Sequence, residues 1–160
     1  MLTLSRVLPA DPEAVVVTVL ALTAHDRTRS RHCFVAEDGT RVSLNLPRGT
    51  VLRGNCLLAS DQGERVRVVA KPEPVVVVTA ASALDLTRAA YHLGNRHVPL
   101  EISADGLKLE PDPVLEAMLA QLGGLCLRTA TLPFEPEAGA YRQGEAHRHS
   151  PSAHAHHHDL

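Results

Sequence analysis

The hydrophobic pattern of this chain changes at a short proline-containing stretch, and that change limits the folds open to it. Before KPEP (Lys71–Pro74), apolar residues come in short runs between turn signals, with no helical period. After it, strand-like runs alternate with runs of helical spacing. Two prolines in four residues favour extended chain and suit a linker. The pattern predicts two small domains, residues 1–72 and 73–140, and a tail, 141–160.

The first half predicts a small all-β domain. Its strand-like runs include LTLSRV, AVVVTVL, TRVSLNL, CLLAS and RVRVVA. Asp38-Gly39 separates FVAE from TRVSLNL as a hairpin turn would, because glycine accepts the positive φ of tight turns. Asp61-Gln62-Gly63 joins two later runs. Alternation in RVSLNL places three residues on one inward face: Val42, Leu44 and Leu46.

Alternating arginines stand out in the middle of this domain. Arg27, Arg29 and Arg31 lie between His25 and His32. Alternate charges on a strand indicate one solvated face. A partner-binding surface is the weaker alternative.

The second half predicts strands and helices in a fixed order. PVVVVTA is typical of a buried strand. SALDLTRAAYHLG predicts a helix that begins at Ser82, with Asp85 completing a capping-box variant. Gly94 is expected to end this helix.

A hairpin and a second helix follow. VPLEIS and LKLE are expected to pair around Ala104-Asp105-Gly106. Asp112 caps the next helix, with Pro113 at its first position. Gly123-Gly124 ends it before the strand LCLRTATL. The order β-α-β-β-α-β predicts an α+β, ferredoxin-like domain with two helices on one face of an antiparallel sheet.

Composition excludes some functions. Aromatic residues make up 2% of the chain and the net charge is −2, so neither base stacking nor a basic footprint supports nucleic-acid binding. No apolar run approaches about 18 residues and no signal-peptide pattern begins the chain, so we expect no membrane contact and a cytoplasmic location. Cys33, Cys56 and Cys126 form no C-x-x-C pair, and each is expected to be a small buried hydrophobe.

Histidine is the residue type that points to chemistry. Six of the ten histidines fall in the last fourteen residues, where the stretch after Phe134 lacks apolar periodicity and is expected to be disordered. These tail histidines are His147, His149, His154, His156, His157 and His158. Imidazole binds Ni²⁺, Cu²⁺ and Zn²⁺ alike, so the three metals compete for such ligands. Other residues interrupt this run of histidines, which favours a natural tail over an affinity tag. Passive buffering of metal is expected to be part of the role of this tail.

Several stretches resemble the family of urease accessory nickel metallochaperones called UreE. YHLGNRHVPLEI (Tyr91–Ile102) is the most specific of them. DGTRVSLNLPRGTVLRGN, DPVLEAMLAQLGG, PFEPEAGAY and the histidine-rich end resemble other parts of the family, so the likeness covers nearly the whole chain.

The resemblance implies a non-enzymatic homodimer that carries Ni(II) to the urease apoprotein complex and its accessory GTPase. It also implies a β domain that binds a partner or peptide. His97, which ends the GNRH motif, would meet its dimer mate at an interfacial nickel site. The plain alternative for His97 is an ordinary surface histidine. His92 is a second ligand candidate, and its alternative is a cationic side chain that favours the negative end of the helix dipole.

The sequence also departs from the family pattern. Some relatives carry H-D-H where this chain has Pro111-Asp112-Pro113, so a secondary site built from those imidazoles is expected to be absent. Gly54-Asn55 stands where relatives often have Gly-Asp. Because Pro111 and Pro113 stand where some relatives keep extra histidines, the tail should matter more here than in those relatives.

Two other functions compete with nickel delivery. General buffering or storage of divalent metals would place most of the binding capacity in the tail. An enzyme would need a nucleophile constellation, a phosphate loop or paired carboxylates, and the sequence contains no such motif. We therefore expect a protein that is not an enzyme.

Overall fold

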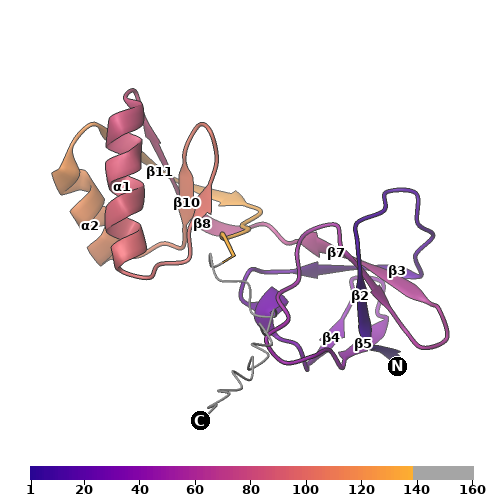
Figure 1. Cartoon of the computed structure of the whole chain (residues 1–160). Helices are drawn as coiled ribbons and strands as arrows, with labels where there is room; N and C mark the ends of the chain where they lie inside the picture. Colours follow the sequence, from indigo (N-terminus) through magenta and orange to yellow (C-terminus); the bar gives the residue numbers. More distant parts are fainter. Residues whose placement is uncertain (139–160) are drawn as a thin grey trace, which may run out of the picture.

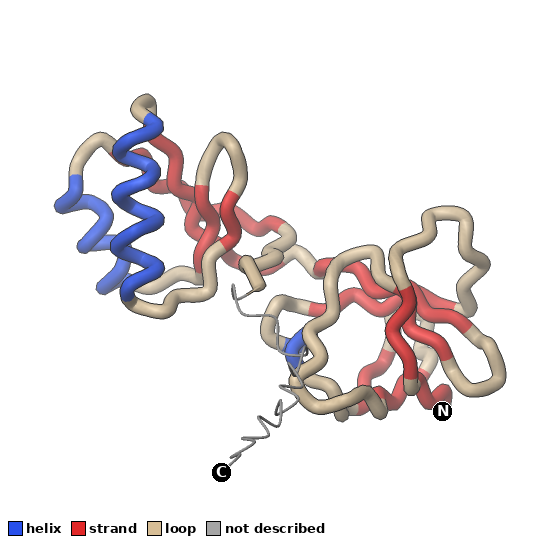
Figure 2. The backbone as a smooth tube through the Cα atoms, in the orientation of Figure 1, coloured by secondary structure: helices blue, strands red, loops and turns tan. Residues whose placement is uncertain are grey.

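The computed structural model describes residues 1–138, and these form two domains joined by a short connection (Figures 1 and 2). The first domain contains two β-sheets, with strand orders β1-β5-β4 and β2-β6-β7-β3. Its elements are β1 (Leu2–Leu4), β2 (Arg6–Leu8), β3 (Thr18–Leu22), a 3-10 turn (Asp26–Thr28), β4 (Cys33–Val35), β5 (Arg41–Leu44), β6 (Leu57–Ala59) and β7 (Arg65–Ala70).

The two sheets of this domain share one core. Leu4 and Val42 from one sheet and Leu20 and Val66 from the other belong to the same buried cluster. The predicted inward face is confirmed, because Val42, Leu44 and Leu46 are all buried. The predicted turns are confirmed too: Gly39 (φ 84°) joins β4 to β5 and Gly63 (φ 88°) joins β6 to β7.

The second domain has the predicted βαββαβ order. Its elements are β8 (Glu73–Ala80), α1 (Ala83–Asn95), β9 (Glu101–Ile102), β10 (Leu107–Leu109), α2 (Pro113–Leu122) and β11 (Leu125–Leu132). The strands pair antiparallel in the order β11-β8-β10-β9. Both helices lie on one face of this sheet (Figure 1), which is the ferredoxin-like arrangement.

Local sequence explains both ends of α2. The Asp112 carboxylate accepts hydrogen bonds from the backbone N–H groups of Val114 (2.8 Å) and Leu115 (3.1 Å). This satisfies two N–H groups that a helix start leaves unpaired. Gly123 and Gly124 both have positive φ and end the helix. The predicted cap and stop are confirmed.

The predicted start of α1 at Ser82 is confirmed, but the predicted capping bonds and the predicted end of the helix were wrong. Ser82 occupies the cap position, but its side chain makes no capping hydrogen bond. Asp85 does not reach back to it, since its carboxylate packs against Gly124 and pairs with Arg88 (3.4 Å). The helix also continues past Gly94 to Asn95.

Two predictions about exposure were also wrong. Cys56 is buried, but Cys33 and Cys126 are exposed, because they occupy outward positions on β4 and β11. Arg27 does not lie on a solvated strand face. It belongs to the 3-10 turn and is only 2% exposed, whereas Arg29 is exposed.

The connection between the domains is shorter than the KPEP pattern predicted. β8 already begins at Glu73, so only Lys71 and Pro72 lie between β7 and β8. Disorder was expected after Phe134, but hydrogen bonds hold Glu135 and Glu137 in place. Glu135 bonds to both domains, and Glu137 bonds to the ferredoxin-like domain. The six tail histidines fall outside the described residues.

Within residues 1–138, no helix has the length and apolar character needed to cross a membrane.

Candidate metal-binding site

His97 occupies a defined position in the turn that ends α1. The backbone N–H of His97 donates to the carbonyl oxygen of Gly94 (3.0 Å), and that of Val98 donates to Leu93 (3.4 Å). This bond pair is the Schellman motif, with His97 at the C′ position, one residue beyond the cap residue Arg96. Val98 and Leu93 also share the core of the domain, which is the hydrophobic contact the motif brings with it.

The C′ position is one that glycine normally fills. His97 has φ 55°, in the left-handed region that side chains with a Cβ avoid at a cost of about 1–2 kcal/mol. Its side chain is exposed, so packing does not explain why an imidazole stands there. A non-glycine residue held in this region is grounds for a functional hypothesis. The other such residue in the described chain is Asn55 (φ 67°), and asparagine and histidine are both among the non-glycine residues that enter this region most often.

We expect His97→Gly to be more stable than His97→Ala by about 1 kcal/mol, because both remove the imidazole and only alanine keeps the strained Cβ. Denaturant unfolding of the metal-free protein measures the difference. Asn95 is the matched control, since it lies inside α1: there alanine should be the more stable of the two substitutions. Equal stability of the two His97 variants would show that the backbone at this position is not strained.

His92 lies one turn earlier, in the last turn of α1. It is half-buried, and its ring meets Tyr91 edge-on with centroids 5.4 Å apart. Tyr91 itself is 65% exposed. Sequence reasoning did not single out Tyr91, and its exposure next to the GNRH motif was not visible from helical periodicity alone.

Within residues 1–138, no three His, Cys, Asp or Glu side chains come together as a group that could hold a metal ion. His25 and His32 do approach one another, but the Arg29 guanidinium lies between them, within 3.4 Å of each ring. A cation in that place disfavours a metal ion.

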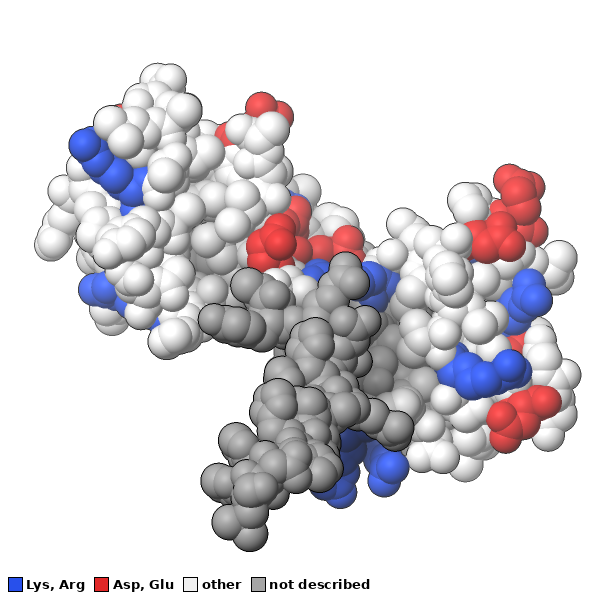
Figure 3. Space-filling view, in the orientation of Figure 1, with Lys and Arg blue, Asp and Glu red and all other residues white. Residues whose placement is uncertain are grey.

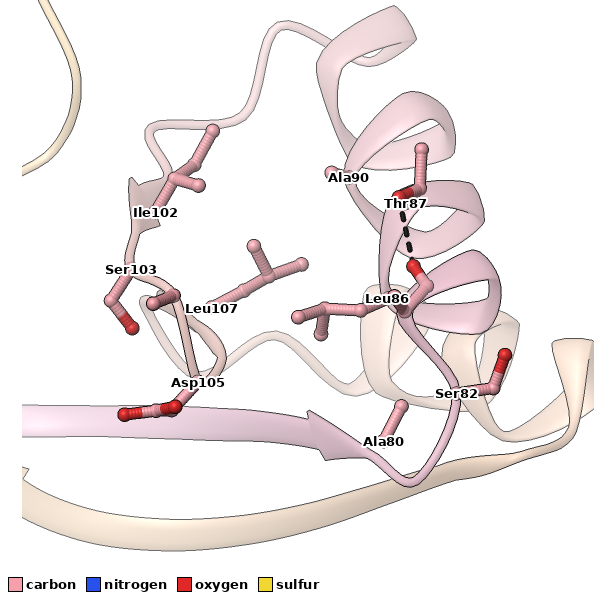
Figure 4. A pocket seen from close by; sticks show the side chains of 11 residues that line it. Ala80, Ser82, Leu86, Thr87, Ala90, Ile102, Ser103, Asp105 and Leu107 are labelled. Carbon is pink, nitrogen blue, oxygen red and sulfur yellow. Dashed lines mark hydrogen bonds between the residues drawn. The ribbon is translucent and has the colours of Figure 1, made fainter.

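An open groove of about 490 Å³ lies elsewhere, between α1 and the β9–β10 hairpin. Figure 4 shows Leu86 and Leu107 facing each other across it, with Ile102 on the hairpin side. The hydroxyl of Thr87 is turned to the Ala83 carbonyl oxygen (2.8 Å). The groove borders the first half of α1 and contains neither His92 nor His97.

The C-terminal segment returns to the loop that carries His97. The backbone N–H of Glu137 donates to the carbonyl oxygen of Leu100 (2.8 Å), three residues beyond His97. The described chain ends one residue later, at Ala138. No periodic signal marks this contact, so the sequence did not predict it.

The fold and the site together define a two-domain α+β protein that presents an imidazole at an exposed helix end. Such an arrangement suits exchange of a metal ion rather than its enclosure in a closed structural site. Family models agree with the division of the chain. The model described as UreE urease accessory protein, N-terminal domain, matches residues 4–71, and the C-terminal domain model matches residues 73–159.

Similar proteins are named urease accessory protein UreE. The protein from Nostoc punctiforme is 52% identical over 151 residues, which cover 94% of this chain and 99% of its own length. The protein from Nostoc sp. is 49% identical over 150 residues, covering 93% and 100%. The protein from Microcystis aeruginosa is 47% identical over 148 residues, covering 89% and 93%. The chain belongs to the UreE urease accessory protein family.

Proposed function

We propose that this chain binds Ni(II) as cargo and delivers it for assembly of the urease active site. The metal leaves by ligand exchange at a site that His97 forms with the same residue of a second chain. Membership of the family supports the role in urease maturation. The observation that carries the site assignment is the exposed imidazole of His97 at a backbone position that favours glycine.

A homodimer would bring together ligands that residues 1–138 of one chain do not. In a two-fold dimer the same surface is used twice, so one histidine near the axis becomes two ligands. A metal shared by both His97 side chains places the axis beside the end of α1. Tyr91 lies less than two turns away and is 65% exposed, and a large aromatic side chain of this kind is a typical anchor of an interface.

The tail is proposed to load this site. Glu137 is bonded to Leu100, so the described chain ends beside the His97 loop. Eight residues lie between Ala138 and His147, and the nine steps along the chain span at most about 30 Å. A short tether of this kind raises the effective concentration of tail histidines at the His97 site. His92 remains a further ligand candidate.

The remaining expectations belong to the same proposal. The chain is a carrier and not an enzyme, it works in the cytoplasm, and its partners are the accessory GTPase and the urease apoprotein complex. The β domain is proposed to bind a partner or peptide. Zn(II) and Cu(II) compete for the same imidazoles, and Cu(II) should bind more tightly than Ni(II). Asp112, which caps α2 with its carboxylate, is left out of the ligand set.

General buffering of divalent metals is the alternative function, and deletion of residues 147–160 separates the two. This deletion removes six of the ten histidines. Under the delivery proposal, urease activation survives the deletion but needs roughly tenfold more nickel in the medium, because only the loading step is lost. The measurement is urease activity in cells over a series of nickel concentrations.

His97→Ala in the full-length chain is the matched variant, because it keeps every tail histidine. It should abolish activation at low nickel. If instead the tail deletion abolishes activation at every nickel concentration while His97→Ala does not, the chain is a buffer.

A further inference from the structure

The segment Pro133–Glu137, here called the clasp, is bonded to the β domain. The Nη1 group of Arg53 donates to the carbonyl oxygen of Pro136 (2.6 Å). The backbone N–H of Gly54 donates to the Glu135 carboxylate. That carboxylate fills the space over Gly54 so closely that a Cβ there would lie 2.8 Å from it.

The clasp is bonded equally to the ferredoxin-like domain. The backbone N–H of Glu135 donates to the Glu101 carboxylate (2.8 Å), and that of Glu137 donates to the Leu100 carbonyl (2.8 Å). Lys108 pairs with Glu101 (2.6 Å) and donates to the carbonyl oxygen of Pro133 (2.9 Å). Figure 3 shows acidic and basic side chains side by side where the two domains meet.

Apolar burial closes the same junction. Phe134 is fully buried, in a cluster with Ala24 of the β domain and Val75 of β8. In this small core, Ala24 comes from the β domain, Val75 from the ferredoxin-like domain and Phe134 from the clasp. Opening the junction would expose all three side chains to water.

Arg27 is the charged residue at the centre of these contacts. Its guanidinium donates to the carbonyl oxygens of Leu22 (2.9 Å) and Phe134. Burial lowers the pKa of Arg27, and the negative charges of Glu135 and Glu73 oppose that shift. A buried cation is tolerated only while its partners are present, and the clasp provides two of them, the Phe134 carbonyl and the Glu135 carboxylate.

We infer that the clasp locks the two domains in one relative orientation, with Arg27 as the positioning residue, and that it fixes the start of the tail beside the His97 loop. The first part stands on the contacts alone. The second part, the position of the start of the tail, rests on the proposed function, in which the tail loads the His97 site. In either case Arg27 touches no metal and acts through the position of the clasp.

Two native cysteines make the domain orientation measurable in the metal-free protein. Cys33 lies in the β domain and Cys126 in the ferredoxin-like domain, both are exposed, and Cys56 is buried. Nitroxide labels on Cys33 and Cys126 give an interdomain distance distribution by pulsed electron paramagnetic resonance. Labelled chains are diluted with an excess of the C33S/C126S variant so that distances within one chain dominate.

The matched pair of truncations ends at Ala138, which keeps the clasp, and at Leu132, which removes it. We expect one narrow distribution for the full chain and for the Ala138 form, and a broad one for the Leu132 form. Arg27→Ala and Glu135→Ala should also broaden it, whereas Arg29→Ala, an exposed neighbour, should not. Far-UV circular dichroism shows which variants fold. If the Leu132 form is unfolded, Glu135→Ala decides.

The tail position has its own label pair, Ala138→Cys with Cys126 in a C33S background. Its distribution should be narrow in the full chain and broad with Arg27→Ala. Narrow distributions in the Leu132 form or in folded Glu135→Ala would overturn the inference that the clasp locks the domains. Because no metal is present, this result is independent of whether His97 binds nickel.

Discussion

His97→Ala is expected to abolish the tight nickel site. In the proposed dimer, the substitution removes an imidazole from both chains at once. Loss of a group that merely supports a ligand lowers metal affinity 10–100-fold, so loss of both ligands should lower it by more than about a hundredfold. Isothermal titration with Ni²⁺ measures the affinity. The titration uses chains that end at Ala138, so that the tail histidines do not contribute.

His25→Ala is the matched control in the same truncated chain, because His25 is another exposed histidine and lies in the β domain. Its titration should match that of the unsubstituted chain, with one tight nickel per two chains. His92→Ala tests the second candidate, and a partial loss would assign it a supporting role. A tight nickel site that survives in His97→Ala would contradict the assignment of His97 to an interfacial nickel site.

Tyr91→Asp is expected to separate the dimer and with it the nickel site. The ring is 65% exposed near the end of α1, where the proposed shared metal would lie. Across a two-fold axis the new carboxylates would face each other, since each surface meets its own copy. Loss of an aromatic anchor typically costs 2 kcal/mol or more, which is a weakening of about thirtyfold or greater. Sedimentation velocity over a range of concentrations measures the change.

Val114→Asp is the control for this substitution. Val114 is 74% exposed on α2, so it matches Tyr91 in exposure while lying on the other helix. This variant should dimerise and bind nickel like the unsubstituted chain. A Tyr91→Asp protein that stays dimeric at micromolar concentration would place the interface away from the end of α1.

The sequence predicted those features that depend on neighbouring residues. The Asp112 cap, the glycine stop after α2 and the Asp38-Gly39 turn each follow from the backbone preferences of a few adjacent residues. The end of α1 was missed for a related reason. Glycine at position 94 looks like a stop, but the left-handed residue of the motif is His97, at a position that glycine fills far more often than histidine.

The features that the sequence could not predict depend on distant contacts. Arg27 follows a polar alternation that indicates exposure, but its guanidinium is held inside by the Leu22 carbonyl and by the Phe134 carbonyl, which lies 107 residues away in the sequence. Glu135 and Glu137 lie in a stretch without periodicity, because they bond one residue at a time to loops rather than packing a repeating face. The pairing of His97 with another chain was expected from resemblance alone, and a single chain does not test it.

The separation of 107 residues between Arg27 and Phe134 sets an order of events during synthesis. At 5–20 residues per second, the ribosome adds Phe134 about 5–20 s after Arg27. The last strand of the β domain, β7, ends at Ala70, 64 residues before Phe134. For the roughly 3–13 s that those residues take, the nascent β domain has its strands but lacks one of the two carbonyl groups that hold its central guanidinium. The last stretch of chain to be made before the histidine tail is therefore the one that completes the first domain. Ribosomes stalled before Pro133 should display a β domain that is more open to proteolysis around Arg27 than the finished protein.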